Sequence, residues 1–254
     1  MRLLAKELRR FALRPVARWV AAGTFVYVVT VVLLAAFTGD GRPLSRTVAD
    51  GDLAGYALVP VLLACVAGAL LATGPNGGTR ALLTVEPRRD RVYWIRAAAA
   101  VAAVLPAVAV AYLLIAAGLW GVTVVAGPPD DPGTTADEAG LLRQLAWSGA
   151  RVLALAVCAA VAGSAVGAAV GRWWAAVPLV VLVPVGVEAV LAALDAEPWS
   201  PLAHARAWAA GPTGADAGAG GPVGSWWASG LLLLTAAAVV TMLGMLTFRR
   251  RELR

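Results

Sequence analysis

The chain has 254 residues, of which 60% are hydrophobic and 14% charged, and its net charge is +6. Its only lysine is Lys6, so it lacks the lysine-containing Walker loop that holds nucleotide phosphates. Its only histidine is His204, and the sequence has neither a zinc-binding motif nor a Ser-His pair within the membrane. The positive charge brackets apolar segments instead of forming a basic face, which argues against nucleic-acid binding. We therefore expect one membrane domain spanning residues 1–254, with no catalytic site, no metal and no cofactor.

The first 18 residues predict an amphipathic helix on the membrane surface. Leu4, Leu8 and Phe11 share one helical face, and basic side chains lie mostly on the other. Such a helix places its apolar face among lipid acyl chains and its arginines on anionic headgroups, and Pro15 would end it. The alternative is a merely basic leader that obeys the positive-inside rule.

Six apolar segments follow, each about as long as the roughly 20 helical residues that cross a bilayer. They cover residues 19–37, 53–73, 97–126, 152–170, 175–194 and 226–248. Backbone groups find no partner in lipid, and the alternation typical of barrel strands is absent, so only helices satisfy them. On the predicted topology, 16 of the 21 basic residues lie on one side, which predicts that both termini are cytoplasmic. The expected fold is an all-α polytopic protein of the plasma membrane.

The cytoplasmic connection 74–96 has more features than a simple linker. Gly77 and Gly78 form a break, and Thr79 is a suitable N-cap for a short helix that carries Leu82 and Leu83. Pro87 would stop that helix. Two leucines exposed to the cytosol predict docking into a groove of another protein. The alternative is a positive-inside loop that binds only lipid headgroups.

These residues carry a resemblance to a known family. Gly78-Thr79, Leu82-Leu83-Thr84, Glu86-Pro87-Arg88-Arg89 and Arg91-Val92 resemble the loop after the second span in permeases of type-2 ATP-binding-cassette (ABC) transporters, especially actinobacterial ones. The resemblance implies a coupling helix that docks on a separate cytoplasmic ABC ATPase subunit, which hydrolyses the ATP. It also implies pairing with a second permease copy or a homologous permease. The residues implied in coupling are Thr79, Arg80, Leu82, Leu83, Thr84, Glu86, Pro87, Arg88, Arg89 and Arg91.

The fourth span repeats glycine every four residues, at Gly163, Gly167 and Gly171. Small residues at this spacing form a smooth ridge that lets another helix approach closely. The ridge predicts helix packing, either within the chain or, as the alternative, between subunits.

Two charged residues lie where a membrane interior is expected, Glu188 in the fifth span and Arg151 at the edge of the fourth. Charges are costly there and are functional candidates by default. The two could pair, or Glu188 could reach outer water or bond to a neighbouring helix. The outer segment that follows, from Asp195 to Val223, predicts a short interfacial helix in its first half.

These patterns, taken with the resemblance, lead us to expect the permease subunit of an ATP-driven exporter. Spans rich in Ala, Val and Leu favour a lipid-like or amphipathic substrate over a sugar or an ion. The alternative is a non-transporting membrane scaffold or accessory subunit that anchors a cytoplasmic partner through the same loop.

Overall fold

The computed structural model describes residues 15–38, 44–49, 51–73, 89–126, 138–196, 199–212 and 225–251. These residues form helices and connecting turns, and no strand occurs among them. The helices are α2 (Pro15–Thr38), α3 (Leu44–Ala49), α4 (Asp52–Ala72), α6 (Arg89–Ala126), α7 (Glu138–Val170), α8 (Trp173–Ala193), α9 (Pro201–Ala210) and α11 (Trp226–Arg251). Within the described ranges six of them, α2, α4, α6, α7, α8 and α11, are long and apolar enough to cross a membrane, which confirms the predicted fold class. The predicted surface helix lies outside the described residues up to position 14, and Pro15 opens α2.

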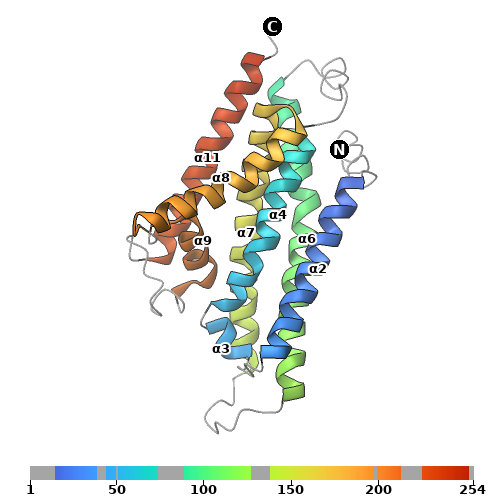
Figure 1. Cartoon of the computed structure of the whole chain (residues 1–254), viewed down its shortest axis with the longest axis vertical. Helices are drawn as coiled ribbons and strands as arrows, with labels where there is room; N and C mark the ends of the chain where they lie inside the picture. The colour runs from blue at the N-terminus through green and yellow to red at the C-terminus, as the bar shows by residue number, and fades with distance from the viewer. Residues whose placement is uncertain are drawn as a thin grey trace.

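The helices form an elongated bundle around α4 and α7 (Figure 1). α2 begins and α11 ends at the same end of the bundle, here called the terminal end, and α3 lies at the opposite, far end (Figure 1). In the apolar stretch of α4 61% of the residues are buried, against 6% in α2 and 11% in α8. Large apolar side chains such as Phe25, Leu182 and Leu243 are exposed on the outer helices. Such an apolar exterior is suited to lipid, where it carries no hydration penalty.

The contact between α4 and α7 is built from small residues. A side-chain Cβ placed on Gly163 would overlap the carbonyl oxygen of Cys65, and one on Gly167 would overlap that of Ala69. The backbones therefore touch, and van der Waals packing of this kind is a main source of helix association in lipid. The predicted glycine ridge packs within the chain through these two members.

Gly171 has a different role from the one predicted. It lies just beyond the last residue of α7, is exposed, and has a φ of 72°. Its N–H donates to the carbonyl of Gly167 at 2.8 Å, as at many helix C-termini that end in a left-handed residue. Gly171 ends the helix and frees the chain to turn into α8.

Two helices extend well beyond the apolar segments expected from the sequence. α6 starts at Arg89, although the third span was expected from residue 97, and α7 starts at Glu138, although the fourth was expected from residue 152. At 1.5 Å per residue these helices are roughly 57 and 50 Å long, more than the ~30 Å hydrocarbon core. Hydropathy marks where lipid surrounds a helix, whereas helical hydrogen bonding continues through the polar residues at its ends.

Candidate functional site

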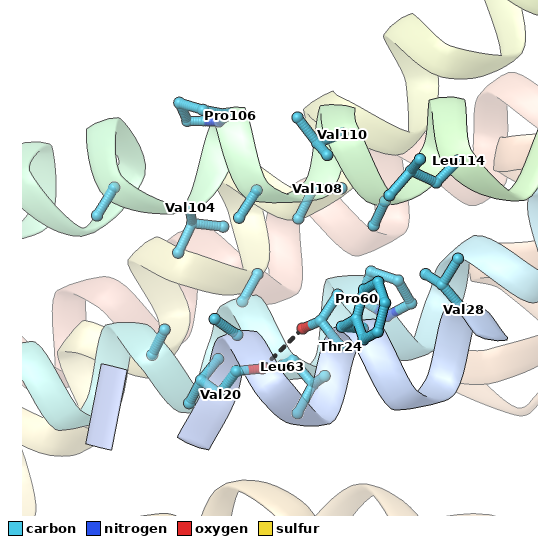
Figure 2. A pocket seen from close by; sticks show the side chains of 17 residues that line it. Val20, Thr24, Val28, Pro60, Leu63, Val104, Pro106, Val108, Val110 and Leu114 are labelled. Atoms are coloured by element: carbon cyan, nitrogen blue, oxygen red, sulfur yellow. Dashed lines mark hydrogen bonds between the residues drawn. The ribbon is translucent and has the colours of Figure 1, made fainter. Parts of the chain in front are cut away.

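A cavity of about 550 Å³ lies between α2, α4 and α6. Of its 17 lining residues, Thr24 is the only one whose side chain has a polar atom, and that hydroxyl donates to the carbonyl of Val20 at 2.9 Å within its own helix (Figure 2). Phe25, Val110 and Leu114 at the rim are exposed, so the cavity opens to the side of the bundle. The site can hold an apolar chain, and its side chains present no unpaired polar group to it.

Two helix prolines, Pro60 of α4 and Pro106 of α6, form part of the wall (Figure 2). A proline has no N–H, so Pro60 cannot bond to the carbonyl of Tyr56 four residues earlier. The hydroxyl of Tyr27 on α2 donates to that carbonyl instead, at 2.8 Å. This bond joins two walls of the cavity at the point where the proline interrupts α4.

Polar contacts join α4, α6 and α11 at the terminal end. Arg96 of α6 is buried and its Nη1 donates to the carbonyl of Ala72, the last residue of α4, at 3.2 Å. Asp90 and Arg249 form an exposed two-pronged ion pair between α6 and α11, with nitrogen–oxygen distances of 2.8 and 2.6 Å. The Arg96–Ala72 bond thus joins α4 and α6, the two helices on either side of the connection 74–88. The Asp90–Arg249 pair joins α6 to α11.

The predicted coupling residues fall mostly outside the described part of the chain. Thr79, Arg80, Leu82, Leu83, Thr84, Glu86, Pro87 and Arg88 lie there. Arg89 opens α6, and Arg91 is exposed in its first turn. Docking of this connection on another protein stays a prediction.

Glu188 bonds to a neighbouring helix, one of the alternatives predicted for it. Its Oε1 accepts from the N–H of Leu202, in the first turn of α9, at 2.7 Å. The Ser200 side chain accepts from the N–H of Ala203 at 2.8 Å, and Pro201 at the first position has no N–H. The N–H groups that begin α9 are thus all satisfied, and the carboxylate faces the positive end of the helix dipole.

Arg151 contacts the opposite end of α9. Its Nη1 donates to the carbonyl of Ala210 at 3.3 Å, and its guanidinium carbon lies 4.8 Å from the ring centre of Trp226. Trp208 of α9 donates in return to the carbonyl of Arg151 at 3.3 Å. Glu188 and Arg151 bond to opposite ends of this ten-residue helix, roughly 15 Å apart, so the direct pair that the sequence left open does not form.

No protein-family model matches this chain, and neither does any curated protein.

The sequence did not predict that Glu188 and Arg151 hold the two ends of α9, although it contains typical signals for where this helix begins and ends. Ser200-Pro201 is a favourable N-cap and first helical residue, and Gly211 is a favourable residue after the last turn. His204 of α9 is 1% exposed and its Nδ1 lies 3.0 Å from the hydroxyl of Ser229 on α11. Only the fold brings these two together.

Proposed function

We propose that the chain is the membrane-spanning subunit of an ATP-driven ABC exporter and works with a separate cytoplasmic ATPase. The chain supplies the passage and the coupling segment, and the ATPase supplies the nucleotide chemistry. The six apolar helices, the one-sided basic charge and the residues Gly78 to Val92 support this proposal.

One structural observation carries the proposal furthest. The connection 74–88 is continuous with α4 and α6, and the same two helices form two walls of the apolar cavity. A displacement of the connection by a docked ATPase would therefore act directly on the cavity walls, with the Arg96–Ala72 bond keeping the two helix ends together. Pro60 and Pro106 lie in these walls, at points where a helix bends more readily.

ATP binding would favour one arrangement of the ATPase subunits, and the coupling segments would convert that preference into a shift between inward- and outward-facing helices. Two copies of the chain, or one copy and a homologous permease, would enclose the passage. The apolar cavity, open toward the surrounding lipid, favours a lipid-like or amphipathic substrate.

The test is co-purification with the candidate ATPase, followed by ATP hydrolysis and vesicle transport. The double change Leu82→Asp plus Leu83→Asp places two charges on the predicted docking face, so we expect loss of the complex and of permease-stimulated hydrolysis. Leu82→Ile plus Leu83→Ile is the matched control, because it keeps the apolar character and the volume. If the aspartate variant still binds and stimulates the ATPase, the docking proposal is wrong.

Transport by the unchanged complex separates the exporter from the scaffold. A complex that forms and hydrolyses ATP but moves no lipid-like probe across vesicles would favour the scaffold. In an exporter, Ala107→Phe at the cavity rim should reduce transport more than Ala117→Phe, an exposed position of the same helix that does not line the cavity.

A further inference from the structure

A second cavity of about 520 Å³ lies beside α7, next to the last residues of α9 and the start of α11. It shares no lining residue with the apolar cavity. Its volume is in the range of small-molecule sites, roughly 300–1,000 Å³. The lining residues are Val48, Gly140, Arg143, Gln144, Trp147, Ser148, Arg151, Ala210, Pro212 and Trp226.

The lining has a single sign of charge. Arg143 and Arg151 contribute two guanidinium groups, Gln144 and Ser148 add neutral polar side chains, and none of the ten lining residues is acidic. A concave surface with one sign of charge concentrates ions of the opposite sign. Guanidinium groups suit phosphate in particular, because their donors match its oxygens.

Arg151 is fixed in position before any ligand arrives. The guanidinium lies against the backbone of Gly211, where an added Cβ would overlap Nη1, and Gly211 has φ 79° and ψ −159°, a conformation almost restricted to glycine. The bond to Ala210 uses one of the five donors of the guanidinium. Among the residues that the structure describes, the other four donors have no hydrogen-bond partner.

We propose that this cavity binds the phosphate of an anionic lipid headgroup. Trp147, which is 59% exposed, and Trp226 both line it, and indole rings favour the headgroup level of a bilayer. Further along α11 the exposed Leu231 and Leu234 offer an apolar surface for acyl chains. The site is independent of the exporter proposal, since it uses neither the connection 74–88 nor the apolar cavity.

The test measures binding of phosphatidylglycerol to the purified full-length chain in detergent, by native mass spectrometry and by the shift of the thermal midpoint. Phosphatidylcholine with the same acyl chains is the zwitterionic reference. We expect tighter binding of phosphatidylglycerol, a weakening of roughly 3- to 10-fold in Arg143→Gln, and further weakening by salt. Arg206→Gln on α9 removes the same charge from an exposed position outside the cavity and should leave binding unchanged.

Arg143 is the chosen position because it is exposed and its loss leaves α9 anchored, whereas a change of Arg151 would also release the end of α9. Equal affinity for the two lipids, or an Arg143→Gln variant that binds like the parent, overturns the proposal. Glycerol 3-phosphate and inorganic phosphate identify the source of the phosphate. If either binds as tightly as phosphatidylglycerol and depends on Arg143, the ligand is a soluble phosphate and the lipid assignment is wrong.

Discussion

Tyr27, Arg151 and Glu188 all bond to backbone groups that have no partner within their own helix. Tyr27 bonds to the carbonyl that Pro60 leaves open, Glu188 to an N–H at the start of α9, and Arg151 to a carbonyl at its end. An unsatisfied backbone group is unfavourable in lipid, where no water can replace the lost partner. These side chains therefore permit a proline inside α4 and the short helix α9, where regular hydrogen bonding fails.

Replacing Tyr27 by phenylalanine should destabilise the protein by about 0.5–1.5 kcal/mol, because the carbonyl of Tyr56 loses its donor while the ring is kept. The measurement is the free energy of unfolding in mixed micelles. Tyr56→Phe is the control, since Tyr56 contributes only its backbone carbonyl to this bond. Equal effects of the two changes would contradict the assigned role of the Tyr27 hydroxyl.

The sequence singled out Glu188 and Arg151 but could not give their partners. Those partners are main-chain atoms of α9, 14 and 59 residues away, and main-chain atoms carry no sequence signature. Counting residues along the spans left a direct pair open, because such a count does not include α9, to which both side chains bond. Each of the two side chains bonds to one end of α9 and not to the other side chain.

Among the helices, α7 makes the closest contacts, and its glycines should tolerate little change. Gly163→Ala would force a methyl group into the Cys65 carbonyl, so we expect a loss of about 1–3 kcal/mol of stability. Gly186→Ala in α8 is the matched control, because a Cβ there meets nothing within 4 Å and alanine favours a helix by roughly 0.5–1 kcal/mol over glycine. Thermal unfolding in nanodiscs measures both, and a Gly163→Ala variant as stable as the Gly186→Ala variant would argue against close α4–α7 packing.

Hydropathy predicted the six long helices well, because each is a continuous apolar run without the alternation of barrel strands, and lipid admits only helices and closed barrels. It could not predict α3, which has six residues, or the polar first turns of α6 and α7. The apolar cavity also has no sequence signal. Its walls come from three helices, and each lining residue alone resembles any other lipid-facing residue.

For the whole molecule, the orientation in the membrane can be tested by cysteine labelling. In a background carrying Cys65→Ala and Cys158→Ala, we expect Arg46→Cys to react with an impermeant maleimide on intact cells. Arg88→Cys should react only after the membrane is opened, because the excess of arginine on its side predicts a cytoplasmic location. The reverse pattern would place the connection 74–88 outside the cell and remove the basis for an ATPase partner.

The position of α7 in the chain has a consequence for biosynthesis. α7 packs against α4, α6, α8, α9 and α11, yet it is the fourth of the six long helices to leave the ribosome. Until it arrives, the small-residue face of α4 around Gly68 has no α7 backbone to touch. A nascent chain that stops before Glu138 therefore holds its first three long helices in the bilayer without their principal partner, and a chaperone or protease of the membrane would meet it in that state.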